Sequence, residues 1–347
     1  MFVAWRDLRF AKGRFALMGT VVVLITLLVG LLSGLTAGLA RDNTSALGAL
    51  PADRLAFAAP PSGQSVSFTN SVVSSATWHA WRQAPGVRAA DPIAVSTLNA
   101  KVGGRTAAVS SFAVPPGSRL APAPVREGSV VLSRGAAGDL AARTGDTLTL
   151  GGRTLTVAGV AGEDSYSHTP VVWTALADGA PATVVALTLG SGADLTATDH
   201  RLATRSLTLT DALAALPAYQ AENGSLQLMR GFLFVISALV VGAFFTVWTI
   251  QRSADIAVLK ALGASTPYLL KDALGQAVVM LTAGTLAGTG IAALAGSLVG
   301  DAVPFVLDPA TTLGPAAVLI VLGVLGAALS IRRITAVDPL TALGSAR

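Results

Sequence analysis

The sequence predicts an α-helical membrane protein with four transmembrane helices and an extracytoplasmic α+β domain inserted between helices 1 and 2. The 347-residue chain is 52% hydrophobic and only 12% charged, so it is more apolar than an ordinary soluble domain. Four uncharged stretches are long enough to cross a bilayer, which needs about 20 residues. They cover residues 15–40, 231–251, 273–300 and 309–331. The long block 41–230 holds most of the charge and therefore forms the separate domain.

The first uncharged stretch, 15–40, is interpreted as a retained transmembrane helix. Its basic start and the tripeptide Gly38-Leu39-Ala40 would also suit a cleaved signal peptide. The apolar region of a signal peptide is usually about 7–15 residues long, and this stretch is much longer. Retention is therefore the preferred interpretation.

The block 41–230 is predicted to contain more strand than helix. Residues 147–157 alternate around Gly151-Gly152, which is a strong hairpin pattern. A second Gly-Gly pair follows 98–102 and predicts a similar hairpin. Residues 133–143 are expected to form a short helix that ends at Gly145-Asp146. About 190 residues are enough to bury a core of one or two subdomains.

The charges of the short segments predict the orientation. Segments 1–14, 252–272 and 332–347 each carry an excess of Lys and Arg, whereas 301–308 has two Asp and no basic residue. By the positive-inside rule, the first three are cytoplasmic, and 41–230 and 301–308 lie outside. The net charge of +5 is then a consequence of topology, and the sequence gives no reason to expect nucleic acid as a partner.

The cytoplasmic segment 252–272 is predicted to hold a short helix, a break and a second helix. Ser253 can cap the first helix, and Asp255 lies in its first turn, where a carboxylate favours the helix dipole. Gly263 suits the stop, and Thr266-Pro267 restarts a helix that enters the third span. One interpretation is a surface presented to a partner; the alternative is an amphipathic helix that lies on lipid.

This segment closely resembles the cytoplasmic coupling region of FtsX-like permeases, a family that includes MacB-type and lipoprotein-releasing ABC transporters. The resemblance is carried by Asp255, Ile256, Ala257, Val258, Leu259, Lys260, Ala261, Leu262, Gly263 and Ala264. The family more often has Glu where Asp255 stands. Residues 4–9 resemble the family's amphipathic elbow helix within 1–14. Residues 332–343 resemble its closing Asp-Pro-x-x-Ala-Leu, and 130–160 its extracytoplasmic domain.

The resemblance implies a permease subunit of a dimeric ABC exporter, in the plasma membrane of a bacterium. A homodimer is the first expectation and a heterodimer the alternative. ATP and Mg²⁺ would be bound by a separate ATPase subunit, and this chain would bind no cofactor. Two other functions stay open: a force-transmitting complex that regulates an envelope hydrolase, and a partner of a sensor kinase.

The residues agree with a chain that is not itself an enzyme. A Walker A motif needs Gly-Lys before Ser or Thr, and none of the four lysines follows a glycine. The chain has no cysteine, and no Gly-x-Ser-x-Gly nucleophile motif occurs near 135. His79, His168 and His200 lack the spacing of metal ligands and are interpreted as ordinary surface or core residues.

The substrate is expected to be hydrophobic or amphipathic. The short chain looks most like the haem-efflux branch of the family, so haem is a candidate, beside peptides, lipids and drugs. A haem site would need an axial ligand and apolar walls near the outer leaflet. The candidate residues before and at the start of the second span are Tyr219, Glu222, Met229 and Phe232. The alternative interpretation is an interfacial connector with ordinary anchoring residues.

Small residues in the spans predict close helix packing. Gly284-x-x-x-Gly288 permits two helices to approach closely, either within one chain or between two. No charged residue lies within a span, so an ion or proton site at the middle of the membrane is not expected.

Overall fold

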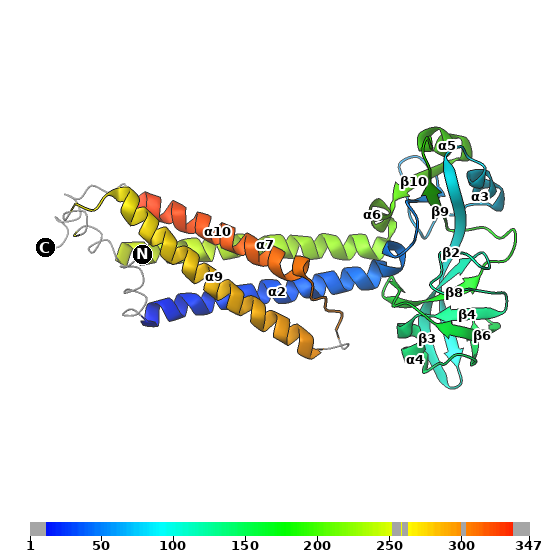
Figure 1. Cartoon of the computed structure of the whole chain (residues 1–347), viewed down its shortest axis with the longest axis horizontal. Coiled ribbons are helices and arrows are strands. Elements are labelled where there is room, and N and C mark those ends of the chain that lie inside the picture. Colours follow the sequence, from blue (N-terminus) through cyan, green and yellow to red (C-terminus); the bar gives the residue numbers. More distant parts are fainter. Residues whose placement is uncertain (1–11, 252–257, 259–262, 300–302, 336–347) are drawn as a thin grey trace. The chain divides into compact units, whose positions relative to one another are not determined.

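The computed structural model describes residues 12–251, 258, 263–299 and 303–335 (Figure 1). They fall into two units. The helical unit contains the residues up to Gly38 and from Ser225 onward, and the strand-rich unit contains Leu39–Gly224.

Four long helices account for most of the helical unit. They are α2 (Lys12–Gly48), α7 (Pro217–Gln251), α9 (Thr266–Val299) and α10 (Pro309–Thr335). Each contains a segment that is long and apolar enough to cross a membrane: Ala16–Gly48, Pro217–Trp248, Pro267–Leu298 and Pro309–Leu329. The helices α2 and α7 extend past the uncharged stretches 15–40 and 231–251. Charge marks the edge of an apolar span but does not end a helix. The added residues of α7 include Glu and Gln, which are good helix formers, whereas those of α2 are mostly weak formers that are held by the burial of Ala46 and Leu47.

Glycines set the contact between α2 and α9. A Cβ added at Gly288 would lie 2.6 Å from the carbonyl oxygen of Val23, and one at Gly284 would lie 2.8 Å from Cγ1 of Val22. The predicted Gly-x-x-x-Gly motif therefore packs against a helix of the same chain, which answers the question that the sequence left open. Further along, the ring of Phe305 lies against both Gly34 and Gly296.

The strand-rich unit is built on one ten-stranded sheet in the order β10-β1-β9-β2-β3-β8-β4-β6-β5, with β7 paired to β8. Within this sheet, the first half of the long strand β2 pairs with β9 and its second half with β3 and β5. The pairing of β2 with β5 closes β2-β3-β8-β4-β6-β5 on itself. The strands are β1 (Arg54–Ala58), β2 (Val87–Val102), β3 (Arg105–Val114), β4 (Ser129–Leu132), β5 (Thr147–Leu150), β6 (Arg153–Val160), β7 (Ser165–Tyr166), β8 (Thr169–Ala175), β9 (Val184–Leu189) and β10 (Thr204–Thr208).

Both predicted Gly-Gly hairpins are confirmed. The pair Gly151-Gly152 joins β5 to β6 with φ of 55° and 80°, and Gly103 at φ 55° opens the turn from β2 to β3. These left-handed values suit a two-residue turn in which glycine has no Cβ to clash. The helix predicted over 133–143 is shorter, at Arg134–Leu140 (α4), because Ala141 takes a left-handed conformation and ends it.

Three clusters of buried side chains fill the strand-rich unit. One lies inside the closed strands around Leu132, Leu140 and Leu148. A second packs Trp78 and Trp81 of helix α3 (Ser75–Arg82) on strands β1, β9 and β2, near helix α5 (Leu195–Leu202). The largest joins the end of α2 to the sheet through Ala46, Leu47, Phe112 and Trp173, with help from α6 (Leu209–Ala212) and the 3₁₀ turn Leu213–Ala215. The end of α2 is thus part of this core.

Candidate functional site

Most of the predicted coupling segment lies outside the described residues. Of the ten residues from 255 to 264, the structure describes Val258, which is exposed, and Gly263 and Ala264. Gly263 has φ 94°, the left-handed conformation expected of a helix stop. The predicted restart at Thr266-Pro267 is confirmed, since α9 begins there.

The four residues proposed for substrate binding all lie on α7. Tyr219 is partly buried against the largest core of the strand-rich unit, and Glu222 is 39% exposed. Met229 and Phe232 belong to the helical unit, where both are exposed, at 49% and 59%. The structure gives Glu222 specific partners, which the sequence did not predict.

Glu222 meets two side chains that are far away in the sequence. Its carboxylate lies 2.9 and 3.0 Å from Nε2 of His168, and 2.8 Å from Nδ2 of Asn43. The same Nδ2 lies 2.9 Å from Nε2 of His168, so the three polar groups touch one another pairwise. Asn43 is only 1% exposed, and its Oδ1 has no hydrogen-bond partner. We call these residues the Asn43–His168–Glu222 cluster.

A strained turn presents His168 to the cluster. The two-residue loop between β7 and β8 has φ 50° at Ser167 and 61° at His168. Each left-handed residue that is not glycine costs about 1–2 kcal/mol. The backbone N–H of Ser167 donates to the carbonyl of Asn43, and that of His168 donates to the carbonyl of Asp42. Contacts with α2 thus hold the turn in place, and such strain often marks a functional site.

The surroundings of the cluster are charged and tightly bonded. Glu163 accepts a hydrogen bond from Arg134 at 2.7 Å and lies 3.8 Å from Arg41. Burial raises the pKa of the Asp164 carboxyl. Burial also raises the pKa of the Tyr166 phenol above its ordinary value, so that this side chain stays neutral. Hydrogen bonds and an ion pair thus connect residues 41–45 of α2 to the segment 163–168.

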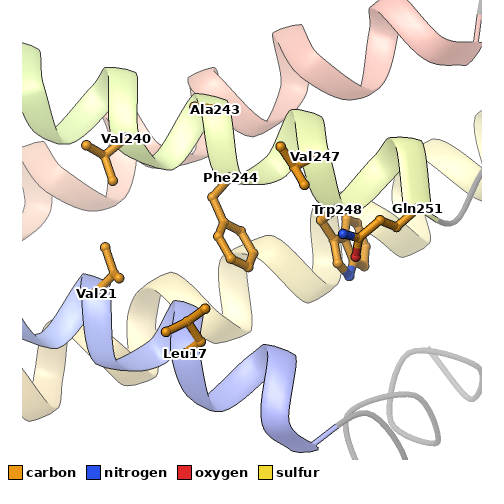
Figure 2. Close-up of a pocket in the computed structure, with 8 residues that line it drawn as sticks. All are labelled: Leu17, Val21, Val240, Ala243, Phe244, Val247, Trp248 and Gln251. Carbon is orange, nitrogen blue, oxygen red and sulfur yellow. The ribbon is translucent and has the colours of Figure 1, made fainter.

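A second candidate site is an apolar groove in the helical unit. Figure 2 shows Leu17 and Val21 of α2 facing the side chains of α7 across it. The groove has a volume of about 520 Å³, which is within the usual range for small-molecule sites. It is lined by Leu17, Val21, Val240, Ala243, Phe244, Val247, Trp248 and Gln251. Gln251 supplies a polar group at one end of an otherwise hydrophobic surface.

The sequence did not predict that His168 and Asn43 would contact Glu222. His168 is 125 positions from Asn43 and 54 from Glu222, so no local spacing announces the cluster. One signal was present: the short loop at 167–168 lacks the Asn-Gly or Gly-Gly that a two-residue hairpin normally uses.

Two family models match the chain. The model of the MacB-like periplasmic core domain matches residues 16–205, and that of the FtsX-like permease C-terminal domain matches 228–339. A Staphylococcus haemolyticus protein named putative hemin transport system permease HrtB is 37% identical over 39% of this chain and 38% of its own length.

Two further relatives differ in coverage. An uncharacterized ABC transporter permease of Mycobacterium tuberculosis is 25% identical over 76% of each chain. The pyoverdine export ATP-binding/permease protein PvdT of Pseudomonas fluorescens is 32% identical over 41% of this chain and 22% of its own length. The chain therefore spans less than half the length of the curated hemin permeases that it matches.

Proposed function

This chain belongs to the FtsX-like permeases that carry a MacB-like periplasmic core domain, and from that premise we propose that it is the membrane subunit of an ATP-driven exporter. The observation that carries the proposal is that the two models match consecutive parts of the chain, the first beginning with one candidate span and the second covering most of the other three. A relative whose name includes ATP-binding and permease functions supports an ATPase as the partner, here on a separate chain.

The proposed mechanism is mechanical relay. The ATPase would bind the segment 252–272 and, on ATP-driven closure, move the helices that follow and precede it. The helix α7 precedes the segment, and α9, which follows it, packs on α2 through Gly284 and Gly288. The helices α2 and α7 suit the relay because each contributes residues to both units without a break. Ala46 and Leu47 at the end of α2 are buried in the core of the strand-rich unit. A shift of the helix would therefore displace residues of that core. The same relay would serve the alternative role, the regulation of an envelope hydrolase.

The proposed orientation follows from the charge bias, with 252–272 inside and the strand-rich unit outside. Cysteines introduced by Ser265→Cys and Ser118→Cys are expected to react oppositely with a membrane-impermeant thiol reagent in intact cells. The native chain has no cysteine, so each variant reports a single site. Labelling of the Ser265→Cys protein only after the cells are opened would agree with the proposal. Labelling from outside would contradict it.

We propose a hydrophobic or amphipathic substrate, with haem as the specific candidate. The named hemin relative supports the class. The apolar groove lies at the Gln251 end of α7, at the other end of that helix from Glu222, and is not part of this site. The Glu222 carboxylate supports haem, because it can supply an oxygen ligand to iron. Tyr219 beside it offers a phenol that could act in the same way. Met229 and Phe232 are proposed as apolar contacts, since both are exposed on α7.

Titration of the purified chain with haem tests this proposal. The parent protein is expected to shift the Soret band and to give a largely high-spin spectrum, as an oxygen ligand implies. The double change Glu222→Ala with Tyr219→Phe is expected to lower the affinity at least ten-fold. Glu127→Ala removes an exposed carboxylate of the strand-rich unit and serves as the matched control.

The outcomes of this titration bear on the haem proposal and not on the assignment of the chain to its family. An unchanged titration in the double variant would remove Glu222 and Tyr219 from the haem site. Absence of haem binding by the parent protein would remove haem as the substrate. Either result would leave the membership of the family untouched, because that rests on the whole-chain matches.

A further inference from the structure

We propose that the Asn43–His168–Glu222 cluster binds a divalent first-row transition-metal ion. The three side chains come from three elements: the end of α2, the turn between β7 and β8, and the start of α7. All three residues lie in the strand-rich unit, so the site is complete within one unit. The inference does not rest on the haem proposal, since it concerns a free ion; Glu222 is the one residue that the two proposals share, and His168 and Asn43 belong to the metal site alone.

The hydrogen bonding within the cluster is incomplete. If Nε2 of His168 carries a hydrogen, it can donate to Glu222 but then faces the NH₂ group of Asn43, a second donor, at 2.9 Å. If Nε2 has no hydrogen, its lone pair faces the carboxylate instead. Turning the amide round brings Oδ1 to within 2.8 Å of the carboxylate, which places two acceptors together. With Glu222 ionised, each arrangement leaves one contact between like groups.

A cation removes this conflict. With the amide turned, Oδ1 of Asn43, Nε2 of His168 and an oxygen of Glu222 all present lone pairs to one point. Asn43 is only 1% exposed, so its amide cannot turn towards solvent to escape the conflict. The turned amide places Nδ2 where no partner lies, a cost of about 1–3 kcal/mol that the bonds to the ion must exceed.

The distances indicate the coordination geometry. The three atoms are separated by 2.8, 2.9 and 2.9 Å. In an octahedral site with bonds of about 2.0–2.1 Å, neighbouring ligands are about 2.9 Å apart. In a tetrahedral zinc site they would be about 3.3 Å apart. The cluster therefore fits three adjacent positions of an octahedron, and the exposed sides of His168 and Glu222, 34% and 39%, leave room for water at the others.

The ligand set narrows the choice of ion. One imidazole with two oxygen ligands suits Mn²⁺, Fe²⁺, Co²⁺ or Ni²⁺ better than Ca²⁺ or Cu⁺, and affinity rises along that series. In this proposal the strained turn at Ser167 and His168 holds the imidazole in position before the ion binds. Among the described residues, no group of three or more His, Cys, Asp or Glu offers a competing site.

Calorimetric titration of the detergent-solubilised full chain with Ni²⁺, without haem and without a histidine tag, tests the proposal. One ion per chain is expected to bind. His168→Gln and Glu222→Gln should each weaken binding at least about ten-fold. Since the chain has three histidines, the double variant His79→Gln with His200→Gln is the matched control and should bind as the parent does.

Two further measurements guard against misfolding and fix the geometry. Asn43→Asp keeps the shape of the side chain and adds a negative oxygen ligand, so it should bind Ni²⁺ more tightly. The Co²⁺ form should show the weak visible bands of a six-coordinate ion. Binding that survives His168→Gln, intense four-coordinate bands, or no binding at all would overturn the proposal. No binding would mean that a proton on Glu222 satisfies the cluster. Titrating the His168→Gln variant with haem distinguishes a loss of metal binding from a loss of haem binding, because the haem proposal does not use His168.

Discussion

Replacing Leu259 by Asp is expected to abolish export while leaving the chain inserted in the membrane. The sequence predicts that Ile256 and Leu259, which lie outside the described residues, share one face of a short helix, and we propose that this face docks into an apolar groove of the ATPase. A carboxylate there would have to be buried without a partner. Loss of such a central contact costs about 2–4 kcal/mol, which is enough to separate the subunits at working concentrations. Insertion should survive, because the segment lies outside the uncharged stretches.

The measurement is substrate-stimulated ATPase activity of the reconstituted complex, together with co-purification of the two subunits. Leu259→Met is the control, since it conserves volume and apolar character and should cost little. Normal stimulation in the Leu259→Asp complex would show that the segment merely rests on lipid. The alternative interpretation of 252–272 as an interfacial helix would then replace the coupling role.

The membrane part of the fold could be predicted because its signal is local. Each span is a run of residues without charge, and a bilayer imposes its own length on such runs. The Gly-Gly hairpins were equally local, because a two-residue turn needs positive φ and glycine supplies it. Helix limits were harder to predict. Ala141 ended α4 before the glycine that was expected to do so, and nothing in its own chemistry favours a left-handed conformation.

The candidate site could be predicted only in part. Glu222 was singled out for its place before the second span, and the structure gives it two polar partners. Those partners lie 179 and 54 positions away, so they become neighbours only when β7, β8 and both helix ends pack together. Spacing rules for metal ligands apply within one helix or loop. They therefore gave no reason to connect His168 with Asn43.

The packing of α2 on α9 leads to the largest structural effect that we expect. Two glycines two positions apart on α9 have opposite environments. Gly288 is buried, and a Cβ there would meet the Val23 carbonyl oxygen at 2.6 Å and Cβ of Thr26 at 2.7 Å. Gly290 is exposed, and a Cβ there would have no neighbour within 4 Å. The same substitution at the two sites separates packing from helix propensity.

Gly288→Ala is expected to destabilise the helical unit by about 1–3 kcal/mol, because the added methyl group collides with the backbone of α2 and forces the two helices apart. Small residues at such a contact are what allows membrane helices to approach closely. Gly290→Ala should leave stability unchanged or raise it slightly, since alanine is the better helix former. The midpoint of thermal unfolding, followed by size-exclusion chromatography of the detergent-solubilised chain, measures both. Equal midpoints for the two variants would mean that α9 does not pack on α2 through Gly288. The Gly-x-x-x-Gly motif would then be free to serve a contact between two chains.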